Sequence, residues 1–511
     1  MEEAKPKLKK GSRFLNLIEK VGNALPHPAT LFGIFALLVL LLSWAGNLLG
    51  WSGVHPATGE EVNIINLLSR DGIHQILLKM VDNYTGFAPL GIVMVALLGI
   101  GIAESSGLIT SAVRLLVLKA PKSMLTFIMV FTGLLSNVAS DLGYILIIPI
   151  AGIVFNSVGR HPIAGMAAAF AGVSGGFSAN IIIGTIDPLL AGLSTEAARI
   201  VDPTYYVLPT ANYYFMAVST IVIAFAGTWI TNSFVEPRLG KYKGDVKPES
   251  LESLTKLEKK GLLWSGIVFL VWLAIFLWGL IPDNGFFRGE DNSILHTPLL
   301  KGFIAVLFLV TGTMGIVYGF ITKKFKSDTD VIKGMTDSFK SIVAFLVLVF
   351  FASQFVAWFK WSNLGLVLAI NGAAFLQDIN LGLIPLVILF VLFSAFINLF
   401  MGSASAKWAI LAPVFIPMFM LLGYSPELSQ AVYRIGDSVT NIISPMMSFF
   451  ALIIVYFEKY DKKAGMGTLI STMLPYSVGF LIFWLALIII WILLGLPLGP
   501  DAGLYYPKIV N

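Results

Sequence analysis

The sequence has no cysteine and few charged side chains. Of its 511 residues, 12% are charged and 57% are hydrophobic. Without Cys, a disulfide framework, an iron–sulfur cluster and a Cys-ligated zinc site are excluded. A soluble chain of this length would carry about a quarter charged residues to cover its surface. The composition therefore predicts a polytopic membrane protein, and the net charge of +5 indicates basic loops at a membrane surface rather than a nucleic-acid site.

Long apolar runs dominate the chain, and runs of roughly 18 residues or more are typical of transmembrane helices. Seven such runs are continuous: 29–51, 86–107, 211–236, 262–281, 300–322, 340–360 and 470–495. Two more, 161–199 and 426–457, are long enough to cross a membrane but are interrupted by Gly, Pro and Asn, which predicts broken helices. The nine crossings follow a basic segment, 1–28, without a cleavage site, so we expect a retained cytoplasmic N-terminus.

Two further segments, 123–157 and 384–422, are too short for two crossings and too long for one, because 35 helical residues extend about 52 Å. Small polar residues lie near the middle of these segments: Ser136, Asn137, Asn398, Ser403 and Ser405. We therefore expect two re-entrant helical hairpins whose tips stop inside the bilayer. Irregular backbone at that depth requires surrounding protein or a water-filled cavity.

The distribution of basic residues favours this all-α topology. With nine crossings and two hairpins, most of the 34 Lys and Arg lie on the cytoplasmic side, including those at 238–260 and 323–340. If each hairpin were a single crossing, these two clusters would move outside, against the positive-inside rule. The topology places the protein in the inner membrane of the cell, with the C-terminal tail 496–511 outside.

The order of elements indicates an internal repeat, with 29–236 and 300–495 as its two halves and 237–299 as a linker, a connecting helix and an outer loop. Asn137 and Asn398 are 261 residues apart, and the same spacing separates Asn180 from Asn441. Corresponding spans are separated by an odd number of crossings, so the halves must be inverted. Inverted repeats with discontinuous helices are typical of secondary transporters.

Charged residues within the spans are candidates for function because they are costly in lipid. Asp187 follows the first break, where it either caps the half-helix that starts at Pro188 or has a proton- or substrate-linked role. Arg434 and Asp437 share one face of a helix. They either form a self-neutralising pair or leave Arg434 to bind a substrate carboxylate.

Residues at the tips and breaks supply further candidates. Lys407 and Trp408 follow the second tip, where Trp408 is expected to provide an aromatic stacking wall. Uncharged oxygen donors would suit Na⁺, whereas the carboxylates of Asp187 and Asp437 would suit H⁺, and the sequence does not choose between these ions. The candidate donors for Na⁺ are Ser136, Asn137, Asn398, Ser403, Ser405 and Asn441, with Asn180 and Asn441 also expected near the substrate. No other cofactor is expected.

Two other classes of function share some of these features. An ion or solute channel would have similar spans but would not need inverted repeats. An intramembrane serine protease is suggested by Ser174 within a Gly-x-Ser-Gly motif. However, no His lies in any later span to act as its base. The motif is therefore expected to serve close helix packing, and the protein is not expected to be an enzyme.

The two hairpins, the Asn-Ile-Ile breaks and the Trp408…Pro426…Arg434 spacing resemble the AbgT family of p-aminobenzoyl-glutamate transporters over essentially the whole chain. The resemblance implies a homodimer that imports p-aminobenzoyl-glutamate or exports sulfonamide antimetabolites, coupled to an ion gradient. It implies roles for Asp187, Trp408, Pro426 and Arg434, with Asp437 beside them. A p-aminobenzoyl ring would stack on Trp408 and a carboxylate would pair with Arg434 or Lys407.

Overall fold

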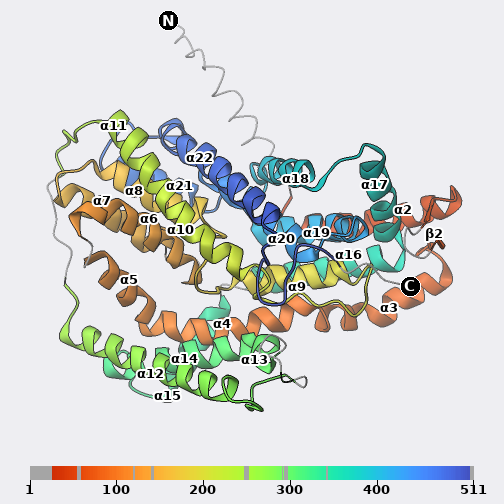
Figure 1. Ribbon diagram of the computed structural model, residues 1–511, viewed down its shortest axis with the longest axis horizontal. Helices are drawn as coiled ribbons and strands as arrows, with labels where there is room; N and C mark the ends of the chain where they lie inside the picture. The colour runs from red at the N-terminus through yellow and green to blue at the C-terminus, as the bar shows by residue number, and fades with distance from the viewer. Residues whose placement is uncertain are drawn as a thin grey trace, which may run out of the picture.

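The computed structural model describes residues 26–54, 59–118, 121–139, 143–246, 253–289, 292, 297–340 and 343–506. Most of the predicted N-terminal segment 1–28 and the last five residues of the tail 496–511 lie outside these ranges. Within them the chain is mostly helical (Figure 1). Two short strands, β1 (Ser52–Val54) and β2 (Glu61–Asn63), pair antiparallel after the first long helix.

Among the described residues, eight helical stretches are long and apolar enough to cross a membrane. Seven of them coincide with the predicted continuous spans: α2 (Pro28–Leu48), α3 with α4 (Arg70–Thr85 and Ala88–Ser106), α10 (Tyr213–Ile230), α12 (Lys256–Leu280), α14 (Phe303–Ile321), α16 (Val343–Trp361) and α22 (Met466–Leu493). The eighth is α19 (Ala404–Leu421), which lies within the predicted hairpin 384–422. The membrane-protein architecture expected from composition is confirmed.

The predicted hairpin segments each contain two helices joined by non-α-helical backbone. In the first, η1 (Lys122–Met124) precedes α6 (Leu125–Leu135), and the short turns η2 (Ser136–Ala139) and η3 (Gly143–Ile147) lie between α6 and α7 (Ile148–Ser157). In the second, α18 (Leu383–Asn398) connects to α19 through residues 399–403, which are not helical. Each turn falls on the small polar residues that suggested it, since Asn398 ends α18 and Ser403 is the N-cap of α19.

Both predicted broken helices are interrupted where expected. The first consists of α8 (Pro162–Phe170), a π-helical turn η4 (Ala171–Gly175), irregular residues 176–185 and α9 (Ile186–Ala198). The second consists of α20 (Pro426–Val439), η6 (Asn441–Ile443) and α21 (Phe450–Glu458), with irregular residues between η6 and α21. Such breaks leave backbone N–H and C=O groups without intrahelical partners.

Several shorter helices were not anticipated from the sequence. They are α5 (Leu108–Leu118), α11 (Glu236–Leu239), α13 (Pro298–Lys301), α15 (Asp328–Lys340) and α17 (Leu364–Asp378), together with the polar helix α3 before α4. The π-helical turn η5 (Thr231–Val235), by contrast, continues α10 within the predicted span 211–236. None of the shorter helices is an apolar run long enough to read as a span. Their order is nevertheless repeated, because α2 to α5 in the first half correspond in sequence order to α14 to α17 in the second.

The packing of the helices also repeats, because equivalent helices of the two halves make equivalent contacts with the opposite half. Helix α14 packs along α4, and α2 packs along α16, so the first helix of each half lies against the other half. In both halves a glycine of the broken helix lies against the first hairpin arm. A Cβ on Gly172 would collide with the carbonyl oxygen of Val130, and a Cβ on Gly436 would collide with that of Val391. Val130 and Val391 are separated by the same 261 residues as the paired asparagines.

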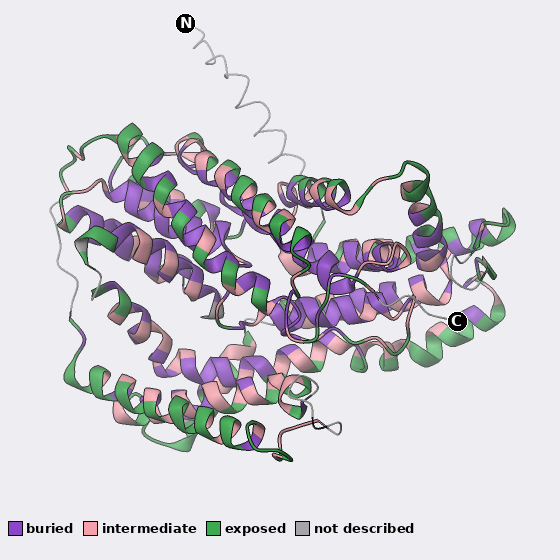
Figure 2. Ribbon diagram, in the orientation of Figure 1, coloured by how far each residue is buried: buried purple, intermediate pink, exposed green. Residues whose placement is uncertain are grey.

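Burial is concentrated on the broken helices and on α19 (Figure 2). Every residue of α20, Pro426–Val439, is buried, although the helix contains Glu427, Arg434 and Asp437. By contrast, α12 buries only Gly261, Ser265 and Gly279, as expected of a helix whose apolar side chains face lipid. The charged groups of α20 must therefore find their partners inside the protein.

Candidate functional site

A central cavity lies where both hairpin tips meet both helix breaks. Its volume is about 330 Å³, and α4 and α16 complete its wall. Aromatic side chains form much of the lining: Tyr144, Phe177, Phe345 and Phe449. Tyr144 and Phe449, from different halves, stack with their ring centroids 4.5 Å apart. Polar groups interrupt this surface, and they are Asn137, Thr185, Ser405 and Ser448. Small-molecule sites commonly combine such an apolar wall with a few placed polar groups.

Behind one side of this cavity, Arg434 joins the two halves of the chain. Its Nη2 atom lies 2.6 Å from Asp187 Oδ1, and both side chains are buried. The same guanidinium donates to the Ser178 carbonyl at 3.2 Å. Asp187 Oδ2 accepts from the backbone N–H of Gly184 at 2.8 Å and faces Asn180 Nδ2 at 3.4 Å. Asp187 is thus in the first turn of α9 rather than at its N-cap, which is Thr185.

Asp437 pairs with Lys407 instead of Arg434, so the self-neutralising pair considered from the sequence is wrong. Lys407 Nζ lies 2.6 Å from Asp437 Oδ1, and both side chains are at most 1% exposed. Asn398 holds this pair in place, because its Oδ1 accepts from Lys407 and its Nδ2 donates to the Asp437 carbonyl. Arg434 and Asp437 share a helix, but each side chain turns to a partner on a different element.

Trp408 lies behind the cavity rather than on its wall. Its side chain is fully buried and stacks on Tyr433, with the ring centroids 4.4 Å apart. Its indole N–H donates to Ser194 Oγ at 2.9 Å. In this conformation no face of Trp408 is open to a ligand, contrary to the expected stacking wall. The cavity's own aromatic residues were missed because Phe and Tyr in apolar spans resemble ordinary core residues.

The paired asparagines differ between the halves. In the second half, Asn398 Nδ2 donates to Asn441 Oδ1 at 2.8 Å. In the first half, the corresponding Asn137 is buried, and neither of its side-chain polar atoms has a hydrogen-bond partner among the described residues. The same holds for Asn180 Oδ1 and for the hydroxyls of Ser174 and Ser178. Each unsatisfied buried polar group costs about 1–3 kcal/mol of folding free energy. These groups are therefore suited to bind a ligand or an ion that would satisfy them.

Of the remaining residues that the sequence suggested for the site, one lines the central cavity and the others have structural positions near it or in the helices. Ser405 lines the cavity, and Ser403 caps α19 by accepting from the Ala406 N–H at 3.3 Å. Ser136 donates to the Gly133 carbonyl at 2.6 Å within the first tip. Pro426 begins α20 and does not line the central cavity; its fixed backbone suits the first position of a helix. Ser174 is buried in η4.

Two further cavities adjoin the same elements. One, of about 260 Å³, lies between the start of α2, at His27 and Leu31, and the second tip, and it shares Gly402 and Ser448 with the central cavity. The other, of about 210 Å³, includes Glu196 and Lys360. It is lined by other residues of α9 and α16 and by the junction before α4, three helices that also line the central cavity. Each of these two cavities therefore adjoins elements that also line the central one.

Comparison with known proteins gives similarity over nearly the whole chain. A family model described as the AbgT putative transporter family matches residues 13–506. The p-aminobenzoyl-glutamate transport protein of Escherichia coli is 37% identical over 506 residues, which cover 99% of each chain. MtrF of Neisseria gonorrhoeae, whose structure represents a class of antimetabolite efflux pumps, is 51% identical with a TM-score of 0.91, covering 96% of this chain and 100% of its own. The YdaH transporter of Alcanivorax borkumensis is 45% identical with a TM-score of 0.89, covering 93% and 100%.

Proposed function

Since the chain belongs to the AbgT putative transporter family, we propose that it is a secondary active carrier of p-aminobenzoyl-glutamate and of sulfonamide-type antimetabolites. The named activities of two relatives support these substrate classes, which share an aromatic amine: one is a p-aminobenzoyl-glutamate transport protein and another belongs to a class of antimetabolite efflux pumps. The observation that carries the proposal is the central cavity, because tips and breaks from both halves meet around it.

The three cavities supply the proposed route. The inner cavity at His27 shares Gly402 and Ser448 with the central one, and the outer cavity at Lys360 lies further along α9 and α16, so we assign the two to opposite ends of the route. In alternating access, the hairpins and broken helices move so that the central cavity opens to one side at a time. Gly402 is placed to act in this movement because it borders both the inner and the central cavity.

The cavity chemistry suits an aromatic ring joined to a carboxylate. A benzoyl or sulfonamide ring would pack between the aromatic residues of the two halves, such as Tyr144 and Phe449. Arg434 is buried and does not line the cavity in this conformation, so a glutamate carboxylate would reach it when the tips and breaks move; its Nε has no hydrogen-bond partner among the described residues. Trp408 then acts as a support that fixes Tyr433 and the start of α19, rather than as a stacking surface.

Na⁺ is the coupling ion that the polar groups favour. Protonating Asp187 or Asp437 would leave Arg434 or Lys407 buried without its counter-charge, which is costly. The unpartnered oxygens of Asn137 and the first break need no proton and match a small, hard cation. We place the ion in the first half, because the corresponding asparagines of the second half are bonded to each other.

The membrane location and orientation that we propose for the chain follow from the same topology. The chain is a multi-pass membrane transporter, and we place it in the inner membrane with its N-terminus in the cytoplasm and its C-terminus outside. A homodimer is the proposed assembly. Exposed apolar side chains along α12, including Leu263, Leu270 and Trp278, must be covered by lipid or by the second protomer.

Counterflow in proteoliposomes tests the proposal. Vesicles loaded with unlabelled p-aminobenzoyl-glutamate should accumulate the labelled compound, and an external sulfonamide should compete. Under separate gradients, an inward Na⁺ gradient should drive net flux whereas a pH gradient alone should not. Absence of counterflow with both substrate classes would contradict the carrier assignment, and flux driven by the pH gradient alone would contradict Na⁺ coupling.

A further inference from the structure

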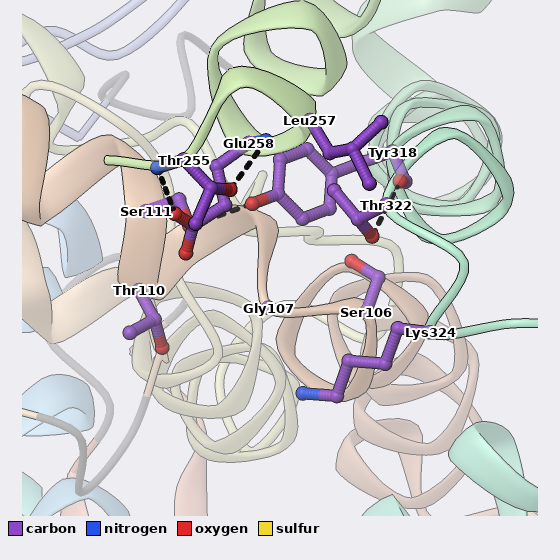
Figure 3. Close-up of a pocket in the computed structure, with 10 residues that line it drawn as sticks. All are labelled: Ser106, Gly107, Thr110, Ser111, Thr255, Leu257, Glu258, Tyr318, Thr322 and Lys324. Atoms are coloured by element: carbon purple, nitrogen blue, oxygen red, sulfur yellow. Dashed lines mark hydrogen bonds between the residues drawn. The ribbon is translucent and has the colours of Figure 1, made fainter.

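A fourth cavity lies apart from the proposed route, where α4 ends, α5 and α12 begin and α14 ends (Figure 3). Its volume is about 360 Å³, larger than that of the central cavity. Hydroxyl groups dominate its lining: Ser106, Thr110, Ser111, Thr255, Tyr318 and Thr322. The cavity shares no lining residue with the central, inner or outer cavity, so the transport mechanism does not explain it.

Among the described residues of this lining there is one carboxylate, Glu258, and it is already neutralised. Its Oε1 lies 3.2 Å from Arg114 Nη1, and its Oε2 accepts from the Thr255 N–H at 2.7 Å. Ser111 and Tyr318, both buried, are also committed, since the Tyr318 hydroxyl donates to Ser111 Oγ at 2.6 Å. The base of the cavity is therefore lined by groups that already have partners, and its carboxylate is too well neutralised to repel an anion strongly.

The rim, by contrast, carries donors that are free. Lys324 is exposed, and its Nζ has no hydrogen bond or ion pair to any described residue. It lies over the corner between α4 and α5, where a Cβ on Gly107 would be 3.4 Å from Nζ. Figure 3 shows the ammonium extending below Gly107 toward the side where Thr110 lies, with Thr255 above them beside Glu258. The Thr110 hydroxyl has no partner among the described residues, and Thr255 Oγ1 accepts from Glu258 N, which leaves its own proton to donate.

The surroundings are basic and border lipid. Lys256, Lys259 and Lys260 begin α12, and Lys323 and Lys326 flank the rim lysine. A few residues further along α12, Leu263 and Trp264 are exposed apolar side chains of a membrane-spanning helix. The cavity therefore opens at the level where lipid headgroups meet the protein, on the face assigned to the cytoplasm. Basic pockets between transmembrane helices on that face bind anionic headgroups.

We propose that this cavity binds a phosphate group through Lys324, Thr110 and Thr255. The source is the headgroup of an anionic phospholipid or a free phosphate, since both present the same charged oxygens. An ammonium with two hydroxyl donors matches those oxygens, and the neutralised Glu258 leaves one net positive charge at the site. The helix starts and ends that meet here would be held together by the bound group.

Binding to the purified full-length protein in detergent tests this site. Dihexanoyl phosphatidylglycerol, dihexanoyl phosphatidylcholine and inorganic phosphate are titrated separately while the thermal unfolding midpoint is followed, since a ligand specific for the folded state raises it. Lys324→Gln should weaken binding of phosphatidylglycerol about fivefold or more, the factor for one lysine near an anionic headgroup. Lys326→Gln, an exposed lysine outside the lining, should leave binding unchanged.

The outcomes separate the possibilities. A response to phosphatidylglycerol that inorganic phosphate does not reproduce identifies a lipid site, and an equal response to inorganic phosphate identifies a free-phosphate site. Thr110→Val, which removes one donor without altering charge, should weaken binding in either case and serves if Lys324→Gln does not fold. Equal responses of the wild type, Lys324→Gln and Thr110→Val, or equal losses in Lys324→Gln and Lys326→Gln, would overturn the proposal.

Discussion

At the scale of single residues, the two buried ion pairs determine what substitutions at the centre would do. Asp187 and Arg434 connect α9 to α20, and Lys407 and Asp437 connect α19 to α20. Desolvation makes such pairs expensive, so they are poor evidence for stability alone. Their position behind a cavity that both halves line indicates that they are retained for binding and movement.

The Asp187→Asn variant is expected to lose coupled transport and some stability. Because Arg434 would remain buried without a counter-charge, the folded state should lose about 3–5 kcal/mol. Adding Arg434→Gln removes the uncompensated charge and should recover much of the unfolding midpoint without recovering transport. Both are measured by thermal unfolding in detergent and by gradient-driven flux in proteoliposomes. Normal flux in the single variant would show that Asp187 has no role in transport.

The Arg434→Gln, Asp187→Asn double variant also separates ligands by charge. If Arg434 binds the glutamate carboxylate, this variant should bind p-aminobenzoyl-glutamate about ten- to a hundredfold more weakly, the usual range for a lost charge-assisted hydrogen bond. An uncharged sulfonamide should lose much less. Competition binding to purified protein provides the measurement. Equal losses for both ligands would mean that Arg434 has only a structural role.

The sequence identified most of the charged residues at the centre but not their partners. The three-residue spacing correctly predicted that Arg434 and Asp437 lie on one face of α20. Their side chains nevertheless point to different neighbouring helices, because that face is broad. The pairing depends on α9 and α19, which are distant in sequence and arrive through packing of the two halves. Lys407 was found because a lysine in an apolar hairpin is unusual, whereas Tyr433 and Ser194 carried no such signal.

At the scale of elements, the hairpin tips pack closely against the helix breaks. A Cβ on Gly402 would collide with the Met446 carbonyl oxygen in the second break. Gly402→Ala should therefore displace the tip and reduce counterflow strongly while leaving the protein in the membrane. Gly91→Ala is the matched control, since a Cβ there meets nothing within 4 Å. Comparable counterflow in the two variants would show that the close approach of tip and break is dispensable.

The extreme end of the described chain is held to the loop before α10 by a carboxylate. Although burial alone would raise the pKa of Asp202, hydrogen bonds from Thr204 and Tyr506 lower it below its usual value. The Tyr506 hydroxyl donates to Asp202 at 3.1 Å. A lowered folded-state pKa means that this contribution to stability is present above the unfolded value of about 4 and is lost as pH falls through the folded one.

The C-terminal segment should consequently loosen in acid. Limited proteolysis between pH 3 and pH 7 should show faster cleavage near Tyr506 at the lowest pH. Asp202→Asn should abolish most of this pH dependence, because the amide cannot titrate. Cleavage that changes equally with pH in the wild type and in Asp202→Asn would show that another group controls the docking of the segment.

The sequence predicted helix breaks better than short helices. The breaks were found from the Gly, Pro and Asn residues that interrupt two long apolar runs, among them Asn180 and Asn441. Helices α3 and α15 were missed because they are short and polar, so their hydropathy does not separate them from loops. Their correspondence in the two halves becomes evident only when the order of all elements is known.

At the scale of the whole molecule, the repeat accounts for the position of the site. Each half supplies a hairpin tip and a break to the central cavity, and each half packs its first helix on the other half. The halves are not equivalent in detail: among the described residues, Asn137 and Asn180 of the first half have side-chain oxygens without partners, whereas the corresponding Asn398 and Asn441 of the second half are bonded to each other. The two inverted halves together form the proposed route. The difference between their asparagines is the reason for placing the ion site in the first half.

Na⁺ dependence tests this asymmetry. Asn137→Ala should raise the Na⁺ concentration needed for half-maximal flux several-fold, because a candidate ligand is removed while the ion pairs remain. Asn371→Ala, at an exposed asparagine of α17 that bonds to Ser52, should behave as the wild type. Flux in proteoliposomes over a range of Na⁺ concentrations gives the comparison. An unchanged Na⁺ response in Asn137→Ala would remove the first tip from the ion site.

The central claim is that the cavity between the hairpin tips opens alternately to the two faces of the membrane. Because the sequence has no cysteine, this can be measured directly with a single introduced thiol. A single Ser405→Cys substitution places one thiol on the wall of the central cavity. In oriented membrane vesicles, a membrane-impermeant maleimide should label this thiol from one face, substrate should protect it, and reversing the ion gradient should shift labelling toward the other face. Labelling confined to one face and insensitive to substrate and gradient would contradict an alternately accessible cavity between the tips.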